Sequence, residues 1–199
     1  MAEKRINPED VDEAIQKLRF PKPNISSDEA AKKSVAMFNE LPEANHCAPS
    51  TITVLQEAYD LPGGELLPWI ASGFRGGVCL GEICGALSGA VMAIGLMAYK
   101  VLEPKTNHEQ KITCQAVLPY IRDLAYAFNR KFGSIHCSVL TQRRERTPEE
   151  HEIHSRLRLT KDTCSPYVDF VVRTMVKWGE ISQEPPPRLS PSPPPLDLG

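Results

Sequence analysis

The chain has 199 residues, 41% hydrophobic and 24% charged, which is the composition of an ordinary folded protein with a core of its own. Its 23 basic and 25 acidic residues nearly balance, so the charge argues against a protein that binds nucleic acid or anionic membranes. Six cysteines are too few for a disulfide-stapled scaffold and the N-terminal stretch has no apolar run, so we expect a cytoplasmic protein with reduced thiols.

The first part of the chain predicts four helices. Asn7 is a suitable cap with Pro8 at the first helical position, and Ser26 or Ser27 is a suitable cap for the second helix. Apolar residues recur at helical spacing in these segments, and a Pro-Gly-Gly sequence at 62–64 ends the third one. The expected helices cover residues 8–20, about 26–41, about 47–60 and 65–72.

A glycine-rich segment then precedes the most apolar part of the chain. Residues 72–77 (Ser-Gly-Phe-Arg-Gly-Gly) hold too much glycine for a helix and predict a tight loop. The central helix is expected over about 81–102. Residues 83–99 carry no charge, which reaches the short edge of a membrane span, but their glycines and alanines favour a buried central helix without stable membrane insertion.

The second half also predicts helices. A long amphipathic helix over 107–132 contains Pro119, which should kink or split it. A short helix follows Cys137, and Thr147-Pro148-Glu149-Glu150 is a helix-start signature that opens a polar segment. The last helix is expected over about 164–182. From Glu184 the chain has seven prolines in sixteen residues, which predicts a disordered or polyproline-like tail.

Together these segments predict an all-α fold, because no alternating strand pattern is present. We expect a single-domain bundle of about five to seven helices around a buried central helix rich in small residues. The expected organisation is an N-terminal helix and linker at 1–25, the helical domain at 26–183 and the proline-rich tail at 184–199.

Four cysteines stand where helices are expected to begin. A thiolate at such a position faces unpaired N–H groups and the positive end of the helix dipole, which can lower its pKa and suit it to redox chemistry or metal binding. A single free cysteine usually only fills space, but four in similar settings favour a function. Their spacing contains no Cys-x-x-Cys, which excludes a zinc ribbon or a ferredoxin loop. Folding must therefore bring together Cys47, Cys84, Cys137 and Cys164.

Small residues recur every four positions around Cys84, at Gly81, Gly85, Gly89 and Ala93. This stripe predicts close packing of two helices, or the close approach of a cofactor or a second thiol. Cys114 fits the apolar pattern of its helix and is expected in the core. His151-x-x-His154 and the arginines at 143–146 lie in polar stretches and are expected on the surface.

The sequence resembles the C_GCAxxG_C_C family of redox-active proteins. The resemblance rests on the segments 71–77 and 81–96, which include Cys84-Gly85-Ala86-Leu87-Ser88-Gly89, and on shorter matches at 46–48, 132–137 and 164–168. It spans about residues 28–180 and implies that Cys47, Cys84, Cys137 and Cys164 are the four family cysteines. A related domain of split-Soret cytochromes carries an iron–sulfur centre, which implies a cluster here, with [2Fe-2S] favoured.

The sequence departs from the family pattern at three positions. His46 stands where the family commonly has Asn, and Arg75 and Cys79 interrupt a loop that is normally glycine-rich. Cys79 would be an extra ligand, a resolving thiol or, as we favour, a neutral substitution. His46 and His136 directly precede motif cysteines, and neighbouring helix residues do not share a face, so we expect no ligand role, although a mixed Cys/His site stays open.

The leading functional hypothesis is therefore one-electron transfer through an iron–sulfur cluster, with an unidentified redox protein as partner. A thiol/disulfide oxidoreductase would use a pair of the same cysteines, and a structural zinc or metal-sensing site would use the same ligands. An interaction module without a cofactor is a further alternative. A homodimer is compatible with each of these readings.

Overall fold

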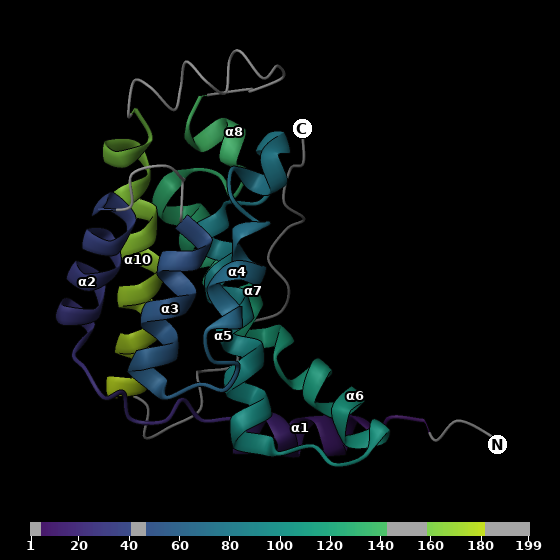
Figure 1. The fold of residues 1–199 in the computed structure, drawn as a ribbon. Coiled ribbons are helices and arrows are strands. Elements are labelled where there is room, and N and C mark those ends of the chain that lie inside the picture. Colours follow the sequence, from purple (N-terminus) through teal and green to yellow (C-terminus); the bar gives the residue numbers. More distant parts are fainter. Residues whose placement is uncertain (1–4, 41–46, 143–158, 182–199) are drawn as a thin grey trace.

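The structure is a computed structural model that describes residues 5–40, 47–142 and 159–181 (Figure 1). Across these ranges the regular elements are helices, and the one β-type contact is an isolated bridge between Ile83 and His136. The predicted all-α class is confirmed. The helices are α1 (Pro8–Lys17), α2 (Ser27–Glu40), α3 (Cys47–Tyr59), α4 (Leu66–Ser72), the π-turn η1 (Gly77–Gly81), α5 (Gly85–Leu102), α6 (Asn107–Ala116), α7 (Leu118–Phe132), α8 (Cys137–Leu140) and α10 (Leu159–Ile181).

Local signals placed several helix ends correctly. The Asn7 side chain accepts a hydrogen bond of 3.2 Å from the Glu9 backbone N–H at the start of α1, which ends three residues earlier than expected. Pro119 splits the long amphipathic segment into α6 and α7, because proline is accepted in the first turn of a new helix but not in a helix interior.

The predicted start of the central helix was wrong by four residues. We expected it near residue 81, but α5 begins at Gly85. The preceding segment is left-handed, with φ angles of 57° at Gly76, 53° at Val78 and 60° at Cys79, and such a backbone cannot continue into a right-handed helix. Left-handed geometry costs about 1–2 kcal/mol per non-glycine residue, so packing of η1 must offset that cost at Val78 and Cys79.

Helix α5 lies along α3 and forms the centre of the bundle. Its small residues face the bundle, and the residues from Gly85 to Leu87 together with Gly89, Ala90 and Ala93 are buried. By length and composition, α5 is also the one helix of the described ranges that could cross a membrane, and half of it is buried inside the structure. Its packing agrees with the buried central helix that we expected.

The core lies between α2, α3, α5 and α10. In Figure 1 the long helix α10 runs beside α2 and α3. At one end of the core the ring of Phe20 packs against Tyr59 and Trp178, with ring centroids 6.1 and 5.4 Å apart. The hydroxyl of Tyr59 donates a 2.6 Å hydrogen bond to the Met175 carbonyl oxygen, which ties α3 to α10.

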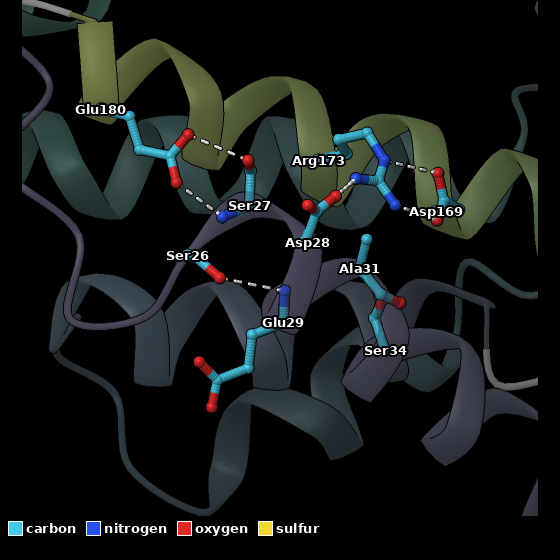
Figure 2. A network of polar contacts seen from close by, with 9 residues as sticks. All are labelled: Ser26, Ser27, Asp28, Glu29, Ala31, Ser34, Asp169, Arg173 and Glu180. Atoms are coloured by element: carbon cyan, nitrogen blue, oxygen red, sulfur yellow. Dashed lines mark hydrogen bonds and ion pairs between the residues drawn. The ribbon is translucent and has the colours of Figure 1, made fainter.

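A polar seam joins α2 to α10 (Figure 2). Glu180 accepts hydrogen bonds from the backbone N–H of Ser27 at 2.7 Å and from its hydroxyl at 2.9 Å. Two helical turns before Glu180, Arg173 donates hydrogen bonds to both carboxylate oxygens of Asp169 at 2.9 and 3.0 Å, and it also donates one to Asp28. Because Asp28 and Glu180 are exposed and Ser27, Arg173 and Asp169 are only partly buried, we expect these bonds to fix the register of the two helices more than they stabilise the fold.

Some sequence predictions fall outside the described residues. These are the helix-start signature at 147–150, the arginines at 143–146, His46, His151, His154 and the proline-rich tail at 184–199. The proposed domain boundaries stay predictions.

Replacing Tyr59 with phenylalanine should lower stability at neutral pH and flatten its alkaline decline. Burial raises the pKa of Tyr59 above its ordinary value of about 10, so its stabilising contribution is complete below about pH 10 and lost as pH rises through the folded-state pKa. At pH 7 we expect Tyr59→Phe to lower the free energy of unfolding by about 1 kcal/mol, because the hydrogen bond to the Met175 carbonyl is lost. Urea unfolding between about pH 7 and 11 measures both effects, with the exposed Tyr99→Phe as control. An unchanged alkaline slope in Tyr59→Phe would contradict this account.

Candidate functional site

Three of the four motif cysteines lie at helix starts, as predicted. Cys47 is the first residue of α3, Cys84 caps α5 and Cys137 is the first residue of α8. Figure 1 shows the starts of these helices at one end of the bundle, beside the first turns of α10. The chain therefore brings segments that are 37 and 53 residues apart in sequence to a common end.

The prediction for Cys164 was wrong in its local detail. Helix α10 begins at Leu159, so Cys164 lies in its second turn and Pro166 lies inside the helix. A helix that began at residue 164, as predicted, would have Pro166 in its first turn, where proline needs no hydrogen-bond donor. Asp162 in the actual first turn favours an earlier start through the helix dipole. The helix dipole therefore favours a thiolate at Cys164 less than it would at the start of the helix.

A short backbone ladder holds Cys84 beside Cys137. The backbone N–H of Cys84 donates to the Ile135 carbonyl at 2.8 Å, and that of Cys137 donates to the Glu82 carbonyl at 2.6 Å. These bonds flank the antiparallel bridge between Ile83 and His136. They fix the start of α5 against the start of α8.

Glycines bring α5 into direct contact with the start of α3. A Cβ atom built on Gly85 would lie 2.4 Å from the sulfur of Cys47, and one on Gly89 would lie 2.6 Å from the carbonyl oxygen of Ala48. Real Cβ atoms do not approach other atoms so closely. The small-residue stripe therefore serves helix packing, and at Gly85 that same packing places the Cys47 sulfur against the start of α5.

Electrostatic interactions relate Cys84 to Cys47 and Cys137, and they relate Tyr167 to Cys84, Cys137 and Cys164. A negative charge on Cys47 or on Cys137 acts on the thiol of Cys84. Charges on Cys164, Cys84 and Cys137 all act on the hydroxyl of Tyr167, whose pKa is raised first by burial and then by these thiols. Tyr167 donates a 2.9 Å hydrogen bond to the Leu140 carbonyl at the end of α8.

Burial outweighs the helix-start effect on the two innermost thiols. Backbone N–H groups of Gly76, Ala48 and Ala86 face the Cys47 sulfur and favour its thiolate, but burial raises the pKa of Cys47 overall. Burial and the neighbouring Cys47 raise the pKa of Cys84 to about 12. The expectation of lowered pKa values is therefore wrong here: both groups are neutral thiols at pH 7, and a thiolate at either needs a nearby positive charge.

The donor set suits a soft metal or an iron–sulfur cluster, because four sulfur ligands are the usual set for both. As the side chains stand, no three Cys, His, Asp or Glu residues of the described ranges are arranged to hold a metal ion. Backbone contacts place the helix starts of Cys47, Cys84 and Cys137 against one another, and Cys164 is related to them through Tyr167, but the sulfur atoms do not form a coordination shell. The four cysteines therefore match a metal or cluster site in the type of their ligand atoms.

The two remaining cysteines are exposed. Cys79 lies on η1 with its side chain in solvent. Cys114 lies on α6 and is exposed as well, which corrects our expectation of a core residue. The break at Val117 divides the apolar pattern between two helices, and α6 buries only Ala116.

Neither histidine that precedes a motif cysteine gains a ligand role from the structure. His46 lies outside the described residues. The Nδ1 atom of His136 lies 3.5 Å from a Glu82 carboxylate oxygen, so the histidine faces an exposed carboxylate beside the ladder.

Tyr167 is the neighbour of the thiols that the sequence analysis missed. It follows Cys164 by three residues, and residues at that spacing share a helix face, so the signal was present in the Cys-Ser-Pro-Tyr sequence. Its ring also packs against Phe128 and Phe132 of α7, with centroids 5.9 and 4.8 Å apart. Tyr167 thus connects the cysteine site to the core.

Comparisons with known proteins found a matching protein family and a relative of this chain. Residues 45–178 match a family model described as "Putative redox-active protein (C_GCAxxG_C_C)", and this range contains all four motif cysteines. An uncharacterized protein of Archaeoglobus fulgidus is 34% identical over 119 residues, which cover 57% of this chain and 75% of that protein. No solved structure matches the chain.

Proposed function

This chain belongs to the C_GCAxxG_C_C family, and on that premise we propose that Cys47, Cys84, Cys137 and Cys164 bind an iron–sulfur cluster that transfers single electrons. The observation that carries the proposal is that Cys47, Cys84 and Cys137 lie at adjoining helix starts, while Cys164 of α10 is related to Cys84 and Cys137 through Tyr167. A common ligand would account for four cysteines on separate helices near one end of the bundle.

The unequal burial of the four thiols supports electron transfer over substrate turnover. Cys47 and Cys84 are buried, whereas Cys137 and Cys164 are partly exposed. When bound, a cluster would supply a reversible one-electron couple, and the resemblance to the split-Soret domain favours the two-iron form. The chain's own contribution is to shield one side from water and to leave the other near the surface, where a redox partner could approach.

Backbone N–H groups would tune the ligands on the inner side. Those of Gly76, Ala48 and Ala86 face the sulfur of Cys47, and those of Ala86 and Leu87 face that of Cys84. Hydrogen bonds to cluster sulfurs raise the reduction potential, because they stabilise the more negative reduced state. Metal binding would also offset the burial that keeps both thiols neutral in its absence.

The same raised pKa values argue against a dithiol exchange enzyme. Exchange requires a thiolate, and burial lowers the thiolate fraction of Cys47 and Cys84 at neutral pH. Structural zinc would use the same four ligands, and it differs from a cluster in colour and redox activity.

Anaerobic purification, followed by metal analysis and visible spectroscopy, tests the proposal. We expect iron and acid-labile sulfide in equal amounts, visible absorbance that bleaches on reduction, and a paramagnetic signal from the reduced protein. A colourless protein that takes up no iron on anaerobic reconstitution would overturn the proposal. Stoichiometric zinc would indicate a structural site, and reversible loss of two thiols without metal would indicate a disulfide enzyme.

A further inference from the structure

Most of the exposed large hydrophobic side chains gather beside the cysteine site. Of the eleven such side chains in the described ranges, seven lie within residues 66–83. Trp69 is 77% exposed, Leu80 75% and Leu66 69%. Val139 of α8 joins them, because Gly81 of η1 packs against the neighbouring Ser138. We call this surface the apolar end face; its main members are Leu66, Trp69, Ile70, Val78, Leu80 and Val139.

Helix α4 is apolar all round, which a helix at a free surface rarely is. Leu67 and Ala71 face the core and are buried, while Leu66, Trp69 and Ile70 lie on the opposite face at spacings of three and four residues. A helix that is apolar on every side is normally covered on every side. The outer face of α4 therefore lacks its covering in the single chain.

We propose that a second copy of this chain covers the apolar end face, so that the protein is a symmetric homodimer. The six main side chains of the face, exposed by 47–77%, present an area on the order of the ~800 Å² that each partner buries in a stable complex. Self-association through one shared patch is the commonest closed arrangement of identical chains.

The lack of charge in the face favours a second copy over a transient redox partner. Across residues 66–81 the sole charged residue is Arg75, which is partly buried. Transient partners are steered by complementary charges and meet through polar surfaces, whereas homodimer interfaces are the more apolar class. Glu65 and Glu82 lie at the two ends of the segment, so charge is confined to the rim.

Dimerisation through this face would bring two cysteine sites toward each other. Ile83 lies directly before Cys84 and Leu80 lies four residues before it, and the ladder joins Cys84 to the segment of Cys137. Cys79 lies between Val78 and Leu80, so a second copy would cover its exposed side chain. This arrangement is independent of which cofactor the site holds.

Sedimentation velocity of the full chain under reducing, anaerobic conditions tests the proposal. We expect twice the mass of one chain, and Leu80→Glu should weaken dimerisation by at least about 30-fold. Leu118→Glu is the matched control, because Leu118 is a half-exposed leucine on α7, outside the face, and its variant should stay dimeric. Iron content measured on the same samples separates a failure of this proposal from a failure of the cluster proposal.

Thiol labelling adds a second readout. A maleimide should label Cys79 more slowly as the protein concentration rises, while Cys114, exposed on α6, should label at a constant rate. A single-chain mass at all concentrations would overturn the proposal, as would equal labelling of both thiols in a dimer. A single chain that binds lipid vesicles through Trp69 would also overturn it and would assign the face to a membrane.

Discussion

Replacing Gly85 with alanine should destabilise the folded chain by about 1–3 kcal/mol, the usual cost of overpacking a core. The added Cβ would lie 2.4 Å from the Cys47 sulfur and 2.8 Å from the backbone carbonyl oxygen of Phe74. The Phe74 oxygen is a backbone atom and the Cys47 sulfur belongs to a short, buried side chain, so relief requires α5 to move away from α3. Urea unfolding of the metal-free protein measures the loss directly.

The matched control is Gly95→Ala in the same helix. A Cβ at Gly95 meets no atom within 4 Å, so alanine there should stabilise α5 by about 0.5–1 kcal/mol through its better helix propensity. The two substitutions are chemically identical and should have opposite signs. Equal effects would mean that helix propensity, and not the contact with Cys47, determines the requirement for glycine at residue 85.

The same substitution should also reduce iron binding, because it displaces Cys47 from the start of α5. We expect the iron content of Gly85→Ala to fall well below that of Gly95→Ala after identical anaerobic reconstitution. The glycine stripe was predicted either as a packing surface or as an approach for a cofactor or thiol. At Gly85 the contact is both a helix-packing contact and the close approach of a thiol, since the atom it meets is the Cys47 sulfur.

Helix ends set by nearby residues could be predicted from the sequence. Asn7 caps α1 and Pro119 divides α6 from α7, because both effects act within one helical turn. The starts of α5 and α10 could not, since the left-handed backbone at Val78 and Cys79 and the extra turn before Cys164 depend on tertiary packing. Nothing in the local sequence marks a valine as left-handed.

The thiol pKa values show why the positions of two cysteines could be predicted while the direction of their pKa shifts could not. The predicted helix-start positions of Cys47 and Cys84 are confirmed, and backbone N–H groups face both sulfurs. Whether the net pKa falls or rises depends on burial, which is a property of the whole bundle. For Cys114 the sequence overestimated burial, because the apolar pattern around it belongs to two helices. The thiol is exposed.

Single substitutions of the motif cysteines should abolish cluster binding, whereas those of the two exposed cysteines should not. We expect Cys84→Ala to retain less than about a tenth of the iron of the unmodified chain, since loss of a ligand costs more than the 10–100-fold typical of an outer-shell change. Cys47, Cys137 and Cys164 should behave alike. Cys114→Ala is the matched control, and Cys79→Ala tests the neutral role that we favour for it.

Circular dichroism of each metal-free variant separates ligand loss from misfolding. Cys137 and Cys164 are partly exposed, so their alanine variants should fold as the unmodified chain does, and a loss of iron there would report on ligation alone. Full iron content in both of these variants would contradict the four-cysteine site. Loss of iron in Cys79→Ala would instead make that thiol a ligand, and because Cys79 lies on the apolar end face, it would place the cluster at the surface that we assign to the second copy.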